Sequence, residues 1–344
     1  MRTWDFCTGN IPYQETKGGT KNVDVWPSFV DGANQIAHAS CLIHPGRWVV
    51  PKKQMQKTRD KMINNGLVNF DYIPDSNEVF PNIRGVDGGI TISYFIHGYT
   101  GDIEYSVNGN SFGIYDKNAR FFSNKFEKEI FEKVVNSFPN TKTMLDRISG
   151  SIGSLGSSEF GYDKNKHFDK LNKSPKNMKK PIQVWAAVGF GKGTHYEWMY
   201  VEKNNINPIP PKITSTRKVM ISKVGVAINS SKKAVGINGV PQIVDKDTTG
   251  ENVFFIFPEN DTDYDLNLIR SLFMTKTARF LMSITQKDLY VRGFENIPDY
   301  TAFIPMLNGK LFTDKFFYDN FDFSNELISH IEECVSPKEE RKEM

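Results

Sequence analysis

Five segments at the start of the chain alternate between strand-like and helix-like sequence, and this order restricts the fold more than any other feature. Residues 4–8, which include Trp4, Phe6 and Cys7, are expected to form a short buried strand, and residues 26–39 have apolar positions at helical spacing. A strand at 41–43, a helix at 52–65 and a strand at 67–73 continue the series. Such alternation is typical of an α/β domain.

The first strand runs into an abrupt turn, Gly9-Asn10-Ile11-Pro12, which is followed by Tyr13. The side-chain oxygen of Asn10 and the carbonyl of Ile11 can both accept hydrogen bonds from an amino group. Pro12 stiffens the backbone, and the ring of Tyr13 offers a stacking face. The same letters also occur in ordinary strand-to-loop turns, so the motif alone leaves open both a plain turn and a site for a flat heterocyclic amine.

A second region is expected beyond a strand at 88–96 and a hairpin turn at either 99–102 or 108–109. A chain of 344 residues is long enough for two domains, which we place at 1–100 and 101–344. The second domain mixes strands and helices and is predicted to be α+β. Its expected elements are a helix at 124–138, paired strands at 182–188 and 195–201, strands at 217–222 and 253–257, a long helix at 263–284 and a capped helix at 324–335.

Basic residues gather in two parts of the second half. Residues 164–180 hold seven lysines and one acid, and residues 212–233 hold six basic residues and no acid. Either cluster alone is equally well explained as a solvated lysine surface. Two clusters beside aromatic-rich strands favour a track for a phosphate backbone. The residues proposed to contact the DNA backbone are Lys164, Lys166, Lys170, Lys173, Arg217 and Lys218.

Several classes of protein are disfavoured by the sequence. The three cysteines are far apart and the histidines are scattered, so neither a disulfide framework nor a metal site is expected. The glycine cluster 189–193 lies between two strands, which indicates a hairpin and not a phosphate-binding loop. Because no apolar run is long enough to span a bilayer and no apolar leader is found, a cytoplasmic location is expected.

The order of motifs resembles that of the adenine-N6 DNA methyltransferases of bacterial restriction-modification systems. The likeness begins with Trp-Asp-Phe-x-x-Gly-Asn-x-Pro-Tyr-Gln at 4–14 and continues through Leu-Ile-His-Pro-Gly-Arg-Trp at 42–48, Asp-Ser-Asn-Glu-Val-Phe-Pro at 75–81 and the Gly88-Gly89 strand. It is closest to the group whose target-recognition domain follows the catalytic domain, including the TaqI type and the single-chain type IIG enzymes. The resemblance covers most of the chain, and its opening motif is the most specific part.

The resemblance implies a partial Rossmann-like methyltransferase domain at 1–100, followed by a DNA target-recognition domain at 101–344 with a basic loop near 150–180. It also implies that double-stranded DNA is the partner and that a flipped-out adenine is the substrate, because the amino group is inaccessible inside the base stack. Asn10 and the Ile11 carbonyl would accept hydrogen bonds from the amino group, and Tyr13 would stack on the base. Phe80 matches an aromatic residue that contacts the base from another side, although it is also compatible with a plain core position.

The sequence departs from the family pattern in two respects. The second motif residue is Ile11 where the family usually has proline, although the acting group is a backbone carbonyl. The glycine-rich motif and the acidic residue that bind S-adenosylmethionine in the family do not occur in the sequence, so the resemblance implies a companion chain that carries this half. A half sheet would leave an exposed apolar strand edge near 5–8.

Two main hypotheses follow from these observations. The first is site-specific adenine-N6 methylation in a restriction-modification system, with S-adenosylmethionine as methyl donor and a partner that supplies the donor site. The second is a catalytically inactive DNA-binding specificity subunit or a truncated remnant of a type II enzyme. A weaker third is a restriction subunit whose nuclease part lies elsewhere.

Overall fold

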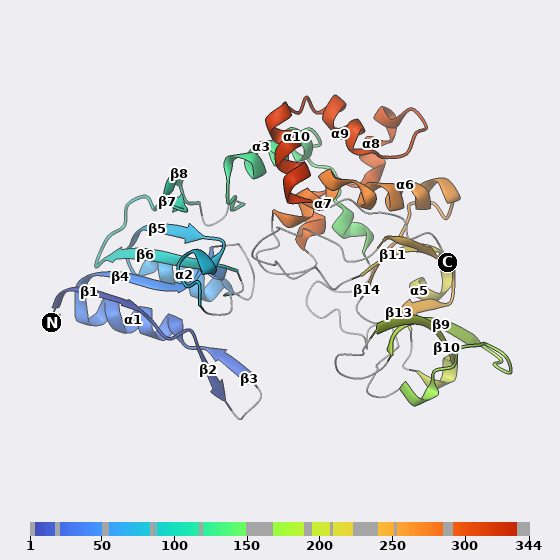
Figure 1. The fold of residues 1–344 in the computed structure, drawn as a ribbon, viewed down its shortest axis with the longest axis horizontal. Helices are drawn as coiled ribbons and strands as arrows, with labels where there is room; N and C mark the ends of the chain where they lie inside the picture. The colour runs from blue at the N-terminus through green and yellow to red at the C-terminus, as the bar shows by residue number, and fades with distance from the viewer. Residues whose placement is uncertain are drawn as a thin grey trace. The chain divides into compact units, whose positions relative to one another are not determined.

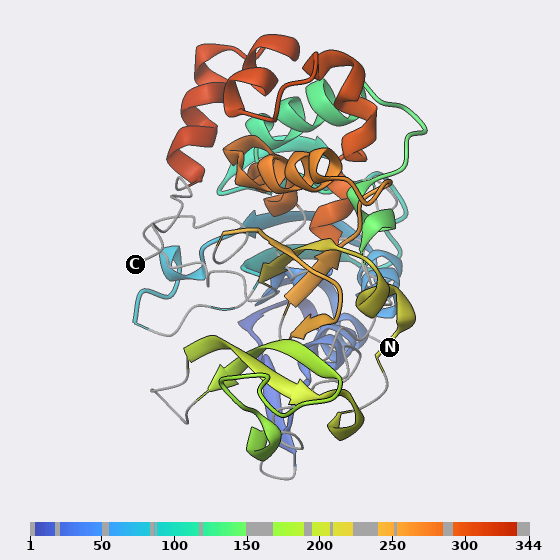
Figure 2. The ribbon, with the colours of Figure 1, turned by 90° about the vertical axis from the view of Figure 1, so that its right-hand side faces the viewer.

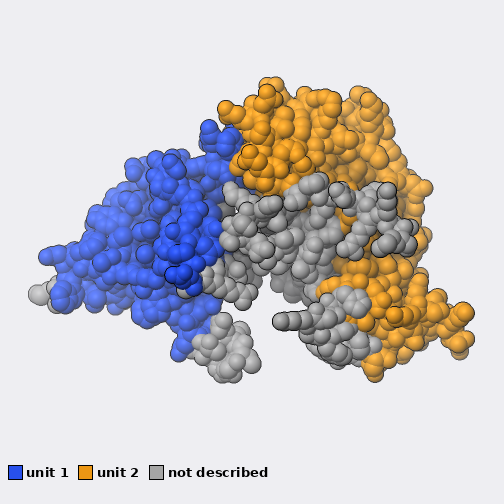
Figure 3. All heavy atoms as spheres, in the orientation of Figure 1, with its two compact units in different colours: residues 1–129, 284–288 blue, residues 130–283, 289–344 orange. Residues whose placement is uncertain are grey.

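The computed structural model describes residues 4–17, 21–49, 55–82, 86, 88–116, 120–148, 168–188, 195–206, 209–222, 240–250, 253–284 and 292–335. The chain divides into two compact units, which Figure 3 colours separately. Unit 1 comprises residues 1–129 and 284–288, and unit 2 comprises residues 130–283 and 289–344. No helix in the described ranges is both long and apolar enough to cross a membrane.

Unit 1 is built on a six-stranded sheet with the order β1-β4-β6-β5-β7-β8 (Figure 1). Strand β1 is parallel to β4, and both β4 and β5 are antiparallel to the central strand β6. Strands β1, β4 and β5 therefore point in the same direction. The strand bounds are β1 Trp4–Asn10, β4 Ala37–Pro45, β5 Leu67–Ile73, β6 Ile90–Ile96, β7 Glu104–Val107 and β8 Asn110–Ile114.

The β7–β8 hairpin turns at Asn108 and Gly109, the second of the two positions that the sequence offered. Strand β7 pairs with β5, so the hairpin belongs to the first sheet. The two compact units divide at 129/130, whereas the expected boundary at 100/101 separates the β7–β8 hairpin from the strand with which it pairs.

Two helices and a hairpin accompany the sheet of unit 1: α1 Trp26–Ile36, α2 Gln56–Asn64, and the strands β2 Gln14–Lys17 and β3 Lys21–Asp24. Helix α1 begins with a proline in its first turn, which suits the helix start. An aromatic core of Trp26, Trp48, Phe70 and Phe95 is almost fully buried. Gly66 links α2 to β5 with a positive φ of 80°, and a Cβ there would lie 2.0 Å from the Ile96 carbonyl oxygen.

Strand β1 differs from one of the sequence-based expectations. It is the edge strand of the sheet, and Trp4 and Phe6 are 62% and 51% exposed. The prediction that 4–8 form a buried strand is therefore wrong, because an apolar run does not reveal whether a neighbouring strand covers it. The prediction of an exposed apolar edge near 5–8 is confirmed.

Unit 2 combines two three-stranded sheets with helices and is a mixed α+β lobe, as expected. The sheets have the orders β10-β9-β13 and β12-β11-β14. Figure 2 shows the β9–β10–β13 sheet at one end of this unit and the C-terminal helices at the other. The strands are β9 Pro181–Val188, β10 His195–Glu202, β11 Lys218–Ser222, β12 Gln242–Val244, β13 Thr248–Gly250 and β14 Val253–Ile256.

The helix expected at 263–284 is two helices, α6 Asp263–Met274 and α7 Lys276–Ser283. Thr275 has an extended conformation, with φ −67° and ψ 146°. Its hydroxyl donates to the Leu272 carbonyl and accepts from the Ala278 amide, so it ends one helix and caps the next. The apolar periodicity continues through the break, which is why the pattern did not reveal it.

Two short helices near the C-terminus were not anticipated. Helix α8 Tyr300–Leu307 is capped by Asp299, and α9 Asp314–Asn320 is capped by Thr313. The remaining helices are α3 Lys125–Val135, which spans the division between the units, α5 Pro211–Ser215 and α10 Asn325–Cys334. Ser324 caps α10, as the sequence indicated.

Candidate functional site

Asn10 is the last residue of β1 and pairs with Ile43 of the parallel strand β4. The amide of Ile11 donates to the Ile43 carbonyl over 3.3 Å, so the ladder continues one residue beyond the strand. The Asn10 side chain is exposed and makes no hydrogen bond within the described part of the chain. The turn therefore presents an amide with unused hydrogen-bonding groups at a strand end that the backbone holds in place.

The carboxyl ends of β1, β4 and β5 lie at one edge of the sheet, because these strands point the same way. In open α/β sheets, ligands bind outside this edge. The loops that follow the three strands contain Asn10–Tyr13, Gly46–Trp48 and Asp75–Phe80. The structure thus brings the turn and the loop of Phe80 to the same edge. Strands β4 and β6 lie between β1 and β5, which separates the two strands by about 14 Å, so contact of Phe80 with a shared base stays a prediction.

The loop that carries Phe80 is tied down by its own hydrogen bonds. Asp75 accepts from the amide of Asn77 over 3.0 Å, and the Phe80 amide donates to the Ser76 carbonyl over 2.8 Å. The hydroxyl of Ser76 accepts from the amide of Val86 over 2.7 Å. Phe80 itself is half-buried. Phe80 is therefore neither a core residue nor a fully exposed one, and hydrogen bonds hold the backbone of its loop.

Tyr13 is anchored by its backbone, since its carbonyl accepts from the Val25 amide over 3.2 Å. The residue is half-buried, and its buried hydroxyl has no hydrogen-bond partner among the described residues. Burial raises the pKa of this hydroxyl, so the ring is neutral at physiological pH. What Tyr13 can offer a ligand is therefore the face of its ring and not its hydroxyl.

Substitution of Tyr13 by phenylalanine is expected to leave stability unchanged or to raise it by up to about 1 kcal/mol, because it removes a buried, unpaired hydroxyl. Urea unfolding measures the change. Tyr72→Phe is the matched control, since the Tyr72 hydroxyl donates to the Gly88 carbonyl over 3.2 Å and its loss should destabilise. A destabilisation of Tyr13→Phe equal to that of Tyr72→Phe contradicts the assignment.

A buried polar layer supports the end of β4. The ring of His44 stacks on Trp26 with the centroids 4.9 Å apart and the planes at 4°. Its Nε2 lies 3.0 Å from the Ser93 hydroxyl, and its Nδ1 lies 3.1 Å from the hydroxyl of Thr91, which also accepts from Trp48. Full burial lowers the pKa of His44 to about 4. The imidazole is therefore neutral and serves to position the strand end.

A salt bridge joins the loop after β4 to the β2–β3 hairpin at this edge of the sheet. The guanidinium of Arg47, in the loop after β4, lies 2.5 Å from Asp24 at the end of β3. Asp24 also accepts from the Gln14 side chain over 3.3 Å. The β2–β3 hairpin, which starts directly after Tyr13, is in this way joined to the loop after β4.

The chemistry of the site is that of hydrogen-bond acceptors and aromatic faces. Asn10 and the backbone of Ile11 can accept from an amine, and Tyr13 can contact a flat ring. Within the ranges that the structure describes, no three His, Cys, Asp or Glu side chains come together as metal ligands. The site can hold and orient a heterocyclic amine.

The lysines proposed to contact DNA are placed unevenly. Lys164 and Lys166 lie outside the described residues, as does the part of the basic loop at 149–167. Lys170 and Lys173 are exposed. The ammonium of Lys173 lies 3.8 Å from the carboxylate of Glu197, a loose and solvated pairing. Both lysines are accessible to a phosphate.

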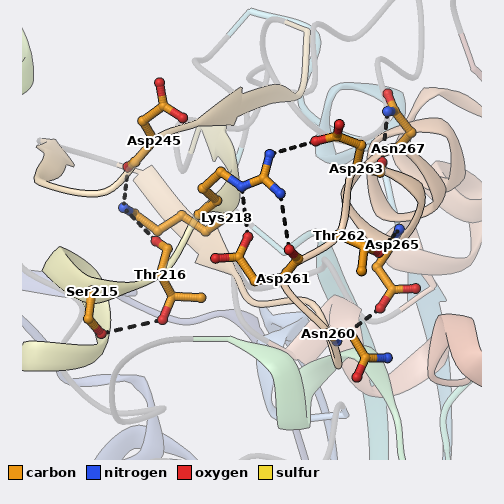
Figure 4. A network of polar contacts seen from close by, with 11 residues as sticks. Ser215, Thr216, Lys218, Asp245, Asn260, Asp261, Thr262, Asp263, Asp265 and Asn267 are labelled. Atoms are coloured by element: carbon orange, nitrogen blue, oxygen red, sulfur yellow. Dashed lines mark hydrogen bonds and ion pairs between the residues drawn. The ribbon is translucent and has the colours of Figure 1, made fainter.

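Arg217 is paired with acidic side chains, and Lys218 lies inside the unit, where Figure 4 shows its ammonium directed at backbone groups. Arg217 forms salt bridges with Asp261 at 2.7 Å and Asp263 at 2.6 Å. Lys218 is fully buried, and its ammonium donates to the carbonyls of Ile213 at 2.7 Å, Asp245 at 3.0 Å and Thr216 at 3.4 Å. Burial lowers the pKa of Lys218 to about 8.

The location of Lys218 follows from its strand. Strand β11 lies between β12 and β14, and its next three residues, Val219 to Ile221, are buried on both faces. A lysine at the first position of such a strand has its ammonium inside the unit, where carbonyls replace water. In this conformation Lys218 is a structural group, and its charge is not available to a phosphate.

Lys218→Met is expected to destabilise unit 2 by about 2 kcal/mol, because the buried Ile213 carbonyl and two part-buried carbonyls lose a donor while the penalty for a buried charge is relieved. Urea unfolding tests this, with Lys246→Met as the control at an exposed position of the same unit. Reduced DNA affinity in a Lys218→Met protein of unchanged stability would restore its role as a DNA contact.

Sequence reasoning missed an aromatic strip on the β9–β10 sheet. The rings of Trp185 and Trp198 are 5.0 Å apart, and Tyr196 stacks on Trp185 at 6.1 Å. The signal was present in the sequence, because alternate residues of one expected strand, Tyr196, Trp198 and Tyr200, are aromatic and its expected partner strand contains Trp185.

Comparison with known proteins gives only distant matches. No protein-family model and no curated protein matches the chain. The chain is similar in structure to the type IIG restriction endonuclease BpuSI, with 10% identity, a TM-score of 0.34 and coverage of 89% of this chain and 45% of that chain. A nuclease-deletion mutant of the type ISP restriction-modification enzyme LlaGI, in complex with a DNA substrate mimic, has 10% identity, a TM-score of 0.38 and coverage of 88% and 41%.

A third similar structure is the type IIL restriction-modification enzyme MmeI in complex with DNA, with 11% identity, a TM-score of 0.40 and coverage of 95% and 56%. The chain spans about half the length of these proteins. One of the three is a restriction endonuclease and two are restriction-modification enzymes, and at these scores the matches do not establish a shared fold.

Proposed function

We propose that this chain contributes the base-holding part of a DNA adenine-N6 methyltransferase in a restriction-modification system. One observation carries the proposal: Asn10-Ile11-Pro12-Tyr13 occupies the carboxyl end of β1, with an exposed amide that makes no hydrogen bond in the described structure. In this proposal, unit 1 contains part of a Rossmann-like methyltransferase domain, and unit 2 is the DNA target-recognition domain.

The proposed site holds an adenine that has left the base stack. The Asn10 side-chain oxygen and the Ile11 carbonyl accept hydrogen bonds from the N6 amino group, and Tyr13 contacts one face of the base. Phe80 borders the base from the loop after β5. S-adenosylmethionine, held by the companion chain, would supply the methyl group that N6 takes up in exchange for a proton released to water. The two acceptors increase the electron density at N6 and fix its direction of attack.

The proposed partners are double-stranded DNA and a companion chain that carries the S-adenosylmethionine site. Lys170 and Lys173 are the described lysines whose charges are accessible to phosphates, and Lys164 and Lys166 are proposed to extend this track. Such contacts orient the DNA and supply affinity without reading its sequence.

The exposed lysines of unit 2 also favour a second candidate function, that of a DNA-specificity subunit which catalyses nothing. Both candidates require binding to duplex DNA, and they differ only in methyl transfer.

Transfer of labelled methyl groups to DNA distinguishes the two. The chain is incubated with DNA and labelled S-adenosylmethionine, alone and together with the folded product of the adjacent gene. Incorporation into adenine supports the methyltransferase. DNA binding without incorporation in both mixtures supports the specificity subunit, and loss of both binding and incorporation contradicts both candidates.

A further inference from the structure

The β9–β10–β13 sheet of unit 2 has two different faces. Ile182, Val184 and Ala186 of β9 pack with Met199 and Val201 of β10 and are buried. Alternate residues of a strand point to opposite faces, so the other face carries the residues between them. That face holds Trp185 of β9 together with Tyr196, Trp198 and Tyr200 of β10.

These four aromatic side chains form a strip along one face, and the ring of Trp185 contacts those of Trp198 and Tyr196. Trp198 lies directly opposite Trp185 in the ladder, with the rings edge-to-face at 61°, whereas Tyr196 is nearly parallel to Trp185 at 17°. All four are partly exposed, although large aromatic side chains usually account for much of a core. Partly exposed rings in a row are typical of binding surfaces.

On the side of β13, the residue next to Trp185 is a glycine. Gly250 pairs with Trp185 in the parallel ladder. A Cβ at Gly250 would lie 3.1 Å from the Cβ of Trp185 and 3.1 Å from a methyl group of Val253. Gly250 is buried, and its lack of a side chain allows β13 to pack closely against Trp185 and Val253.

Lysines outnumber acids along the edge of β10 beside the strip, where Glu197 pairs loosely with Lys173. Asn172 and Tyr200 exchange backbone hydrogen bonds of 2.8 and 2.7 Å, which places the segment around Lys173 along the outer edge of β10. Glu202 is occupied by the backbone amides of Lys179 and Lys180, at 2.9 Å each. The exposed lysines of this region are Lys170, Lys173, Lys176, Lys179, Lys180 and Lys203.

We propose that the strip Trp185–Tyr196–Trp198–Tyr200 is a second nucleic-acid contact, at which unpaired bases of a DNA strand stack on the rings while the surrounding lysines bind its phosphates. Aromatic rows flanked by cations bind single strands in this way, and every base offers a face to stack on. Charge complementarity selects a polyanion as the occupant. The inference goes beyond the adenine site of unit 1 and does not depend on methyl transfer.

The test measures binding of the full chain to a fluorescent single-stranded oligothymidylate by anisotropy. Trp185→Ala and Trp198→Ala are each expected to weaken binding by about 5- to 100-fold. Trp198→Phe, which keeps a ring, should recover most of the affinity, and Tyr264→Ala, at an exposed aromatic of α6, should have no effect. Thermal unfolding verifies that each variant is folded.

An oligonucleotide of the same length with abasic positions separates stacking from charge. This oligonucleotide keeps the phosphates and lacks the bases, so it should bind the wild type at least as weakly as oligothymidylate binds Trp198→Ala. Trp198→Ala should not weaken binding of the abasic strand any further. Lys173→Ala should reduce the salt dependence of binding, by about 0.7 in the log–log slope for one phosphate contact. Two results would overturn the proposal and favour a protein partner for the strip. One is that both tryptophan variants bind oligothymidylate with wild-type affinity. The other is that these variants lose as much affinity for the abasic strand as for oligothymidylate.

Discussion

Asn10→Ala is expected to lower the rate of methyl transfer to adenine by about 100- to 1,000-fold, the range found when one preorganised hydrogen-bonding group is removed from a reacting centre. The side-chain oxygen of Asn10 would be one of two acceptors for the reacting amine. Its loss removes both orientation and electron donation in the transition state. The effect should therefore appear mainly in kcat, with a smaller change in KM.

The same substitution should leave the fold intact, because the Asn10 side chain is exposed and has no hydrogen bond in the described structure. Urea unfolding and duplex DNA binding of Asn10→Ala should match the wild type. Asn136→Ala, at an exposed asparagine of unit 2, is the control for a surface amide. Full activity of Asn10→Ala in the presence of the companion chain would show that the turn only ends the strand and has no role in methyl transfer.

The stability of unit 1 is expected to fall by about 3 kcal/mol as the pH is lowered from 6.5 to 4, through His44 alone. The ordinary pKa of histidine, about 6.5, applies to the unfolded chain, and burial lowers the pKa of His44 to about 4 in the folded chain. The unfolded state therefore binds more protons in this window. The stability that neutral His44 provides is fully present above pH 6.5 and is lost as the pH falls through the folded pKa.

Urea unfolding at several pH values between 4 and 7, followed by tryptophan fluorescence, measures this dependence. His44→Gln should be less stable at pH 7, since it gives up the stacking on Trp26, and its stability should vary less between pH 6.5 and 4. His38→Gln removes an exposed histidine of the same strand and should keep the wild-type pH dependence. If His44→Gln and the wild type show the same slope, His44 is not the titrating group.

The regular elements of unit 1 could be predicted because their patterns are local. The strand at 67–73 was placed at its observed bounds, and the helix at 26–39 ends only three residues early, because burial of one face imposes a repeat that the sequence displays. Whether a strand is central or at an edge depends on what pairs with it elsewhere in the chain. For this reason β1 was wrongly expected to be buried.

The candidate site shows the same limit. The turn at Asn10–Tyr13 was recognised from its sequence alone. That it shares an edge of the sheet with the loops of Arg47 and Phe80 follows from the strand order, which depends on long-range pairing. Lys218 looked like a surface charge because nothing in its neighbourhood of the sequence reveals that β11 is covered on both faces. The aromatic strip required the register of β9 against β10, which places Trp198 opposite Trp185.

The central claim is that Asn10–Tyr13 hold an adenine for methylation at N6, and the methylated nucleosides of cellular DNA test it most directly. DNA is isolated from cells that produce the companion chain with either the wild type or Asn10→Ala, digested to nucleosides and measured by mass spectrometry. The account predicts N6-methyldeoxyadenosine with the wild type and background levels with Asn10→Ala. Equal N6-methyldeoxyadenosine in both, or methylation confined to cytosine, would contradict it.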